Sequence, residues 1–398
     1  MEFQGYLRPD GSVGSRNMVA LIPASRCANE MACRIADEAG PGVHPLLHNQ
    51  PCVHVGPDNV MARRVLTGMG QNPNTVAAIV IGIGCDPFSA FDIANDIATT
   101  GKPVEALTIE AEGDYDIVIS KGIEFAKQMK ADAALLTRQP FDLSHIRLAV
   151  KCGGSDTTSA LGCNPVAGWV VDQIVNAGGT CVFSETAELV GAEHIMARRA
   201  TDPAVARKVL DAVARTDQRI LDAGVDILGS EPTPGNIKGG LTTLEEKSLG
   251  AIAKSGTVPL TGVLDWGEKL PGPGLFFMDG SANTPQMELG LSASGAQLMT
   301  FGLGGGLPAS FRSLPANAMG NLPILPVLKI LSSPKAAREI PYFDLYAGTV
   351  VEGKETVAQV GQRLLEEILL ILSGKPTKIE LRPRYREVME MWRLGPVF

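Results

Sequence analysis

The stretch TVAAIVIGIG at residues 75–84 decides the fold, because its odd and even positions are equally apolar. A strand that is apolar on both faces is typical of the centre of a parallel sheet covered by helices on both sides. Short β-like runs alternate with amphipathic helical stretches on either side of it, as at MVALIP (18–23) and VEALTIE (104–110). These repeated strand–helix units predict an α/β fold with a doubly wound, mostly parallel sheet over residues 1–140.

A second α/β domain is predicted over residues 141–398. The segment RQPFDLSH (138–145) contains proline and polar residues and is typical of a linker. A new strand–helix pattern begins at IRLAVKCGG (146–154), and from EPTPGNIKGGLTT (231–243) onward the chain is rich in Gly and Pro with short strands. We therefore expect two α/β units, the second with Gly/Pro-rich short-strand segments.

Composition excludes several classes of protein. The chain has 398 residues, with 35 Lys and Arg against 43 Asp and Glu, and hence a net charge of −8. No Lys/Arg run exceeds two residues, so the electrostatic signature of a nucleic-acid-binding protein is missing. No apolar stretch approaches the roughly 20 residues that span a bilayer, and the N-terminal segment lacks the apolar core of a signal peptide. We expect a cytoplasmic protein with no nucleic-acid or membrane partner.

The cysteines predict a metal site. Seven are present, an odd number without a C-x-x-C pair, as expected for reduced thiols. Several follow predicted strands, where open α/β sheets assemble their ligand sites, and one of these lies between two histidines. Soft thiolates near imidazoles suit iron or zinc, and three thiolates from separate segments also suit an iron–sulfur cluster. For each cysteine the alternative is a small buried hydrophobic residue. The predicted ligands are Cys27, His48, Cys52, Cys85 and Cys152.

Three polar stretches are candidates for substrate binding and catalysis. KCGGSDTTSALGCNP (151–165) contains two glycines and several hydroxyl and carboxylate groups before a predicted helix, an arrangement that suits an anionic group but also an ordinary capped turn. SETAELVGAEH (184–194) brings carboxylates and an imidazole together, which suits a metal pair or an acid/base pair. PGNIKGG (234–240) sets Asn236 and Lys238 between glycines, where a lysine suits a carboxylate or enolate contact.

Taken together, the motifs resemble those of the altronate/galactarate dehydratase family over essentially the whole chain. The matching segments are GYLRPDGSVGSRN (5–17), CANEMACRIA (27–36), HNQPC (48–52), GIGCD (82–86), KCGGSD (151–156), SETAELVGAEH (184–194), PGNIKGGLTTLEEKSLG (234–250), FMDG (277–280) and DLYAGTVVEG (344–353). The resemblance implies a lyase that removes a β-hydroxyl from a sugar acid to give a 2-keto-3-deoxy acid.

The resemblance also implies cofactors, partners and roles for residues. Family enzymes depend on Fe²⁺ or a similar divalent ion such as Mn²⁺. Many carry a small SAF-type domain ahead of the segment that matches residues 5–17. We therefore expect this domain to be a separate small subunit or to be absent, and we expect a homo- or hetero-oligomer. The expected base is His54, His194 or Lys238. The residues expected to bind the anionic substrate are Arg16, Asn17, Ser155, Asp156, Asn164, Glu185 and Asn236.

Two other functions remain open. A sulfolactate sulfo-lyase, a relative with the split subunit arrangement, would share the proton abstraction and release sulfite instead of water. A scaffold subunit whose small partner performs the chemistry is the non-catalytic alternative.

Overall fold

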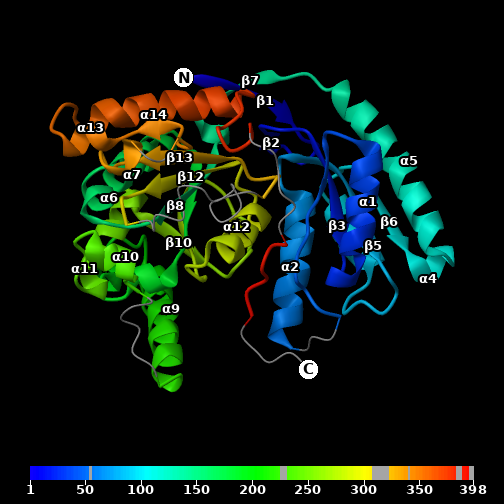
Figure 1. The fold of residues 1–398 in the computed structure, drawn as a ribbon, viewed down its shortest axis with the longest axis horizontal. Helices are drawn as coiled ribbons and strands as arrows, with labels where there is room; N and C mark the ends of the chain where they lie inside the picture. The colour runs from blue at the N-terminus through cyan, green and yellow to red at the C-terminus, as the bar shows by residue number, and fades with distance from the viewer. Residues whose placement is uncertain (53–55, 225–230, 307–321, 339–340, 382–387, 394–398) are drawn as a thin grey trace.

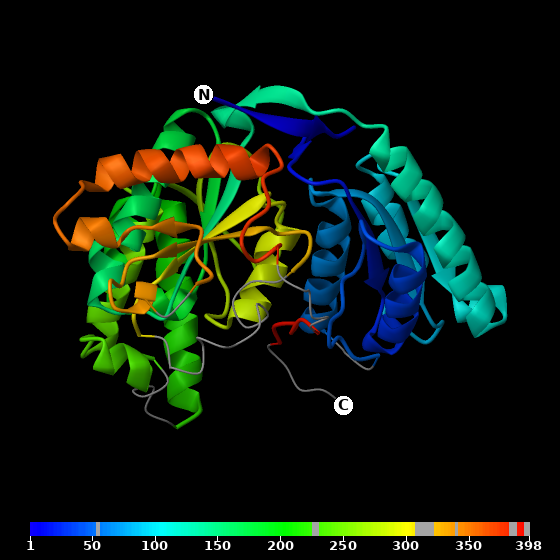
Figure 2. The same cartoon turned by 45° about the horizontal axis from the view of Figure 1, so that its top comes forward.

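In the computed structural model the chain forms two α/β lobes that lie side by side (Figure 1). The structure describes residues 1–52, 56–224, 231–306, 322–338, 341–381 and 388–393. Each lobe is built on its own parallel sheet, and a small antiparallel sheet lies where the two lobes meet at the N-terminal end (Figure 2).

The first lobe is a doubly wound parallel sheet of four strands in the order β4-β3-β5-β6. The central strand β5 is buried at every position, as the apolar run in the sequence predicts. Helices α1 and α5 pack together on one face, and α2 and α3 pack together on the other. The elements are β3 (Met18–Pro23), α1 (Asn29–Ala39), β4 (Val43–Pro45), α2 (Pro57–Gln71), β5 (Thr75–Gly82), α3 (Ala90–Ala98), β6 (Val104–Thr108), α4 (Ile109–Glu112) and α5 (Tyr115–Ala134).

The second lobe contains a parallel sheet of seven strands in the order β10-β11-β9-β8-β12-β13-β14. From β8 the chain winds outward through β9, and from β12 it winds the other way through β13. The boundary between β8 and β12 is therefore the topological switch point, where α/β sheets bind their ligands. The strands are β8 (Arg147–Gly153), β9 (Thr180–Phe183), β10 (Leu260–Leu264), β11 (Gly274–Met278), β12 (Leu298–Leu303), β13 (Val327–Leu331) and β14 (Leu345–Tyr346).

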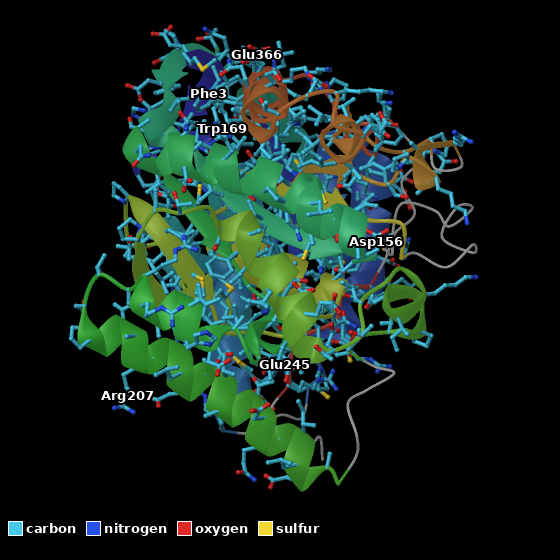
Figure 3. The ribbon with its side chains drawn as sticks, turned by 90° about the vertical axis from the view of Figure 1, so that its left-hand side faces the viewer. Phe3, Asp156, Trp169, Arg207, Glu245 and Glu366 are labelled. Atoms are coloured by element: carbon cyan, nitrogen blue, oxygen red, sulfur yellow. The ribbon has the colours of Figure 1, made fainter. Side chains whose placement is uncertain are left out.

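Helices cover both faces of this second sheet. The C-terminal helix α14 packs on α7 so closely that a Cβ at Gly361 would lie 2.5 Å from the ring of Trp169. Figure 3 shows Trp169 next to α14, which carries Glu366. The helices are α6 (Thr157–Leu161), α7 (Cys163–Asn176), α8 (Glu193–Arg198), α9 (Pro203–Asp222), α10 (Pro234–Lys238), α11 (Leu244–Ile252), α12 (Thr284–Ala293), α13 (Gly348–Val351) and α14 (Val357–Leu372). The predicted α/β class with parallel sheets is confirmed in both lobes.

The segment predicted to be a linker is in part a strand. Residues Gln139–Asp142 form β7, which pairs antiparallel with β1 (Glu2–Leu7), and β1 also pairs with β2 (Val13–Gly14). Proline is tolerated here because β7 is an edge strand, where one side of the backbone needs no ladder partner. The chain thus passes between the lobes through a strand rather than through an unstructured connection.

The two lobes share a hydrophobic core. Helix α2 of the first lobe packs on α12 of the second, and a Cβ at Gly68 would overlap the carbonyl group of Ala293. A single cluster of buried side chains runs through this junction, from Ile22 and Leu66 in the first lobe to Met278 and Phe301 in the second. No helix in the described ranges is both long and apolar enough to cross a membrane.

Candidate active site

A cavity of about 440 Å³ lies at the switch point of the second sheet. It is bounded by the ends of β8 and β12, by residues that follow β9, and by helices α10 and α11. Its walls carry charged and small residues together. The lining residues are Lys151, Cys152, Gly153, Gly154, Ser155, Glu185, Glu188, Glu231, Thr233, Pro234, Gly235, Asn236, Lys247, Ala282, Thr284, Phe301 and Gly306.

Glycines bring three distant segments into backbone contact at this cavity. Gly304 and Gly306 donate main-chain hydrogen bonds to the carbonyl oxygens of Gly153 and Gly154, at 3.3 and 3.0 Å. A Cβ at Gly235 would overlap the carbonyl oxygen of Gly306. Only glycine permits so close an approach, so the glycine-rich stretches serve to bring the loops after β8 and β12 against α10.

A buried cluster of one thiol, two carboxylates and one ammonium forms the floor of the site. The Sγ of Cys152 donates to Oε2 of Glu188 at 3.1 Å. The Nζ of Lys254, in the short 3₁₀ helix Ala253–Ser255, donates to Oε2 of Glu188 at 2.6 Å and to Oε2 of Glu185 at 2.7 Å, and it lies 3.2 Å from the Cys152 sulfur. These side chains are at most 4 % exposed, so the two carboxylates depend on protein cations for their stabilisation.

Glu185 adopts a strained backbone conformation at this point. Its φ is +81° and ψ is 68°, which makes it the one non-glycine residue with positive φ in the described part of the chain. Such left-handed conformations cost of order 1–3 kcal/mol and persist where the surrounding structure imposes them. Here the conformation follows directly after β9 and turns the carboxylate toward Lys151 and Lys254.

Two further lysines line the cavity. The Nζ of Lys151 lies 2.5 Å from Oε1 of Glu185 and 3.0 Å from the carbonyl oxygen of Cys152, and it lies over the Phe301 ring at 5.2 Å. Lys247 pairs with Glu231 and lies 3.6 Å from Oε1 of Glu188. Both lysines are nearly buried, so their charges act in a medium of low effective dielectric, where electrostatic interactions are stronger than in water.

Burial and neighbouring charges set the protonation states of Cys152, Glu188 and Lys254. Burial, with the charge of Glu188, raises the pKa of Cys152, so this group is a neutral thiol. Burial alone would raise the pKa of Glu188, but Lys254, Lys247 and Lys151 outweigh it and hold the pKa below its usual range. Burial likewise opposes the charge of Lys254, yet its anionic neighbours raise its pKa above the ordinary value. The cluster is therefore a carboxylate–ammonium network with a thiol donor.

Cys152, Glu185 and Glu188 are also the candidate group for a metal ion within the described ranges. Their donor atoms lie within 4.8 Å of one another, and thiolate with carboxylate oxygen is a reasonable set for a transition metal. The Nζ of Lys254, however, contacts all three donor groups. A divalent ion does not fit this cluster while the ammonium holds that position.

Comparison with known proteins identifies the family. The model of the D-galactarate dehydratase/altronate hydrolase second domain matches residues 5–134, and the model of the D-galactarate/altronate dehydratase C-terminal domain matches residues 143–397. Together they cover both lobes. The chain belongs to the D-galactarate/altronate dehydratase family. The resemblance drawn from the motifs is thereby confirmed.

Curated relatives carry lyase names. The chain is 37% identical to (2R)-sulfolactate sulfo-lyase subunit beta of Chromohalobacter salexigens, over 95% of this chain and 94% of that protein. It is 30% identical to altronate dehydratase of Escherichia coli, over 97% of this chain and 77% of that protein. It is 29% identical to galactarate dehydratase (L-threo-forming) of Escherichia coli, over 94% of this chain and 73% of that protein. The chain is therefore an enzyme of the lyase class, and the name of the first relative denotes a multi-subunit protein.

Four of the residues predicted for this family site lie on the cavity wall: Cys152, Ser155, Glu185 and Asn236. The Ser155 hydroxyl is buried and has no hydrogen-bond partner among the described side chains and backbone, so a donor is left for a ligand. Asn236 donates from Nδ2 to the carbonyl oxygen of Ser155 at 2.8 Å and accepts from the Thr233 N–H at 2.9 Å. The side chain of Asn236 therefore mainly holds the backbone of the cavity wall in place.

Two other predicted substrate residues of the second lobe hold the fold. Asp156, labelled in Figure 3, caps α6 by accepting from the Ser159 N–H at 2.9 Å and also accepts from the Gly305 N–H at 2.7 Å. Asn164 donates to the carbonyl oxygen of Gly250 at 2.9 Å and ties α7 to α11. Neither side chain is among those that line the cavity.

Arg16 and Asn17 lie near the lobe junction rather than at the cavity. Arg16 forms a two-pronged ion pair with Glu380, with contacts of 2.8 and 3.0 Å, and also donates to carbonyl oxygens at the end of α14. Asn17 donates to the carbonyl oxygen of Ala133 at 3.2 Å. Both residues therefore attach the N-terminal segment to helices α14 and α5.

The predicted five-residue metal cluster is not assembled. Cys27 and Cys85 follow β3 and β5 at the edge of the first sheet, where both are exposed, whereas Cys152 lies buried at the end of β8 in the second. In the described ranges no group of three potential ligands includes Cys27, His48, Cys52 or Cys85. The structure does not bring these residues together in the described ranges, because Cys27 and Cys85 follow strands of one sheet and Cys152 lies in another. Their role as metal ligands stays a prediction.

His48 is a structural histidine. Its Nε2 lies 2.7 Å from the carbonyl oxygen of Pro23, and its Nδ1 accepts from the Gln50 N–H at 3.2 Å, so Nε2 carries the proton and neither nitrogen is free for a metal. Burial lowers the pKa of His48 to about 4.

The burial of His48 predicts that the folded chain loses stability in acid. The unfolded chain protonates His48 near its ordinary pKa of about 6.5, whereas the folded chain resists protonation down to about pH 4. Stability contributed by the neutral imidazole is thus present above pH 6.5 and falls as the pH drops. We expect a loss of about 2 kcal/mol between pH 7 and pH 5 from this group. Urea unfolding at both pH values should show a smaller loss for His48→Gln, while His194→Gln, at an exposed position, should match the wild type. Equal losses in all three proteins would contradict the assignment.

Two of the three predicted bases do not line the cavity. His194, in α8, and Lys238, at the end of α10, are both exposed and do not line it. His54 lies outside the residues that the structure describes, and its role stays a prediction.

Glu188 belongs to the candidate stretch SETAELVGAEH, but four other charged residues of the site were missed from the sequence: Lys151, Glu231, Lys247 and Lys254. One signal was available for the lysines. Lys247 and Lys254 are separated by seven residues in the stretch EKSLGAIAKS, which places both on one face of a helix. Lys151 directly follows the apolar run at residues 148–150 within β8, a position at which a charge requires a partner.

Proposed function

We propose that this chain catalyses β-elimination from a small anionic 2-hydroxy acid, with loss of the substituent on C3. The observation that carries the proposal is the cavity at the switch point, whose wall combines Lys151 and Lys247 with the unpartnered hydroxyl of Ser155. The family's lyase names support the reaction class. Because the charged cavity belongs to this chain, a catalytic role is favoured over that of a scaffold.

The difficult step is removal of the proton beside the carboxylate, because negative charge builds up on a group that is already anionic. Nearly buried lysines stabilise such charge strongly, since they are held in place before the reaction begins. The described contacts use two of the three N–H donors of Lys151, which leaves one for the substrate carboxylate. Ser155 supplies a second donor on the same wall. His54 remains the candidate base.

We propose a sulfonate-bearing acid of the sulfolactate type as the substrate. Proton loss at C2 and cleavage of the C3–S bond would release sulfite, which takes the bonding electron pair, and leave an enol that becomes pyruvate when C3 gains a proton. The cavity supports a substrate with few hydroxyls, because the side-chain oxygens of Thr233 and Asn236 on its wall already accept from each other's main-chain N–H groups. The 37% identity to the sulfo-lyase subunit over nearly its full length also favours this substrate.

Dehydration of a sugar acid of the altronate or galactarate type is the second candidate. It rests on the dehydratase relatives, which align over 94–97% of this chain. Hydroxide would leave C3 in place of sulfite, and the product would be a 2-keto-3-deoxy acid.

We also propose that the chain works with a small SAF-type subunit in a homo- or hetero-oligomer, as the subunit name of the sulfolactate relative suggests. The resemblance implies Fe²⁺ or a similar divalent ion such as Mn²⁺, and the separate cysteines suggested an iron–sulfur cluster as the alternative. The described donor set does not fit such a group while Lys254 is in place, so no step is assigned to a metal.

The test is an anaerobic assay of the chain, purified together with its small subunit, against sulfolactate, altronate and galactarate. Equal amounts of sulfite and pyruvate from sulfolactate are expected. A 2-keto-3-deoxy acid from a sugar acid, without sulfite from sulfolactate, would establish the second candidate instead. No product from any of the three acids would overturn both.

A further inference from the structure

The ammonium of Lys254 has the coordination expected of a small cation. Its nitrogen lies 2.6 Å from Glu188 Oε2, 2.7 Å from Glu185 Oε2 and 3.2 Å from Cys152 Sγ. An ammonium has three N–H donors, and these three acceptor atoms account for all of them. The same three side chains form the candidate metal-ligand group of the described chain.

A metal ion and this ammonium exclude each other. Zinc and similar ions bind carboxylate oxygen and thiolate at about 2.0–2.3 Å, so an ion held by these ligands would lie beside the lysine nitrogen. The two positive charges would then repel each other in a region of low dielectric. Binding would also require Cys152 to lose its proton, which burial and neighbouring carboxylates oppose.

The backbone around Lys254 leaves the side chain little freedom to withdraw. A Cβ at Gly168 of α7 would overlap the carbonyl oxygen of Ala253, so α7 lies directly against this 3₁₀ helix. Arg199 donates to the hydroxyl of Ser255 at 2.8 Å and to its carbonyl oxygen at 3.0 Å. Lys254 itself is only 3% exposed, and a buried ammonium that left its carboxylates would lose its only compensation.

We infer that Lys254 is a built-in cation that occupies a latent divalent-metal site formed by Cys152, Glu185 and Glu188. The folded chain holds this position with its own ammonium and binds no metal there. Removal of the lysine side chain leaves a thiol and two carboxylates around a cation-sized space, and this set then accepts a metal ion. The inference concerns metal binding alone and does not depend on which reaction the chain catalyses.

Cobalt(II) is the probe, because a thiolate ligand produces a sulfur-to-cobalt charge-transfer band. Titration of the anaerobic wild-type chain with Co²⁺ should give no such band. Lys254→Ala should develop it at one equivalent, and the double variant Lys254→Ala with Cys152→Ser should bind without it. Lys247→Ala is the matched control, because it removes a neighbouring buried lysine that contacts Glu188 and leaves Lys254 in place; it should behave as the wild type.

Two results would overturn the inference. One is a cobalt–thiolate band in the wild-type chain that is lost in Cys152→Ser, which would mean that metal displaces the ammonium. The other is a folded Lys254→Ala protein, verified by cooperative thermal unfolding, that binds no Co²⁺. If Lys254→Ala does not fold, Lys254→Ser takes its place in the titration. The wild-type titration can still overturn the inference by itself, and metal analysis of Fe²⁺- and Mn²⁺-treated wild-type protein provides an independent measurement.

Discussion

Replacing Lys254 by methionine is expected to lower the free energy of unfolding by about 3–5 kcal/mol. Methionine has nearly the same length and fills the same space, so the change removes the charge and little of the packing. Glu185 and Glu188 would lose the ammonium that lies 2.6–2.7 Å from their oxygens. Because both carboxylates are at most 4 % exposed, water cannot replace the lost partner. Urea unfolding at pH 7 is the measurement.

The matched control is Lys354→Met, which removes a lysine that is 68% exposed and pairs with Glu352 on the surface. Exposed pairs contribute at most about 1 kcal/mol, so this variant should unfold near the wild-type midpoint. A loss below about 1 kcal/mol for Lys254→Met would mean that the carboxylates have taken up protons or water at little cost. The expected loss is smaller than the 5–15 kcal/mol that typically stabilises a domain, so the cobalt experiment on a Lys254 variant is feasible.

Much of the fold could be predicted from the sequence because its signals are local. The apolar run at residues 75–84 contains β5, and the alternating runs before and after it contain β3 and β6. Strand β7 was missed because a polar stretch that contains proline is typical of a linker. These residues form a strand only because they pair with β1. Pairing between residues more than a hundred positions apart leaves no local pattern.

The candidate site could be predicted only in part. The motifs at the ends of β8 and β9 were recognised as a ligand-binding edge, and neighbouring strands do bring Cys152 and Glu185 together. Cys27 and Cys85 also follow strands, but the structure does not bring them to Cys152 in the described ranges. A sequence shows that a residue ends a strand, but it does not show which sheet the strand joins. Lys254 was missed for a related reason, since it reaches the cluster from 102 positions away.

Replacing Lys151 by methionine is expected to lower kcat/KM by about 10²–10³-fold, comparable to the loss of one oxyanion donor. Lys151 lines the cavity, and its described contacts with Glu185 and Cys152 leave one N–H for the substrate. Its charge is worth more there than in water, because the side chain is 3% exposed and lies over the Phe301 ring. The measurement is the initial rate of product release with the acid that the panel assay identifies.

The folded state should tolerate this change better than the loss of Lys254, because Glu185 keeps the Lys254 ammonium at 2.7 Å. A catalytic role therefore requires a large fall in kcat/KM together with a modest shift in unfolding midpoint. The exposed residue Lys335 provides the control, and Lys335→Met should retain wild-type rates. If Lys151→Met lost stability but kept its activity once folded, Lys151 would be a structural partner of Glu185, and Lys247 would become the cation that faces the substrate.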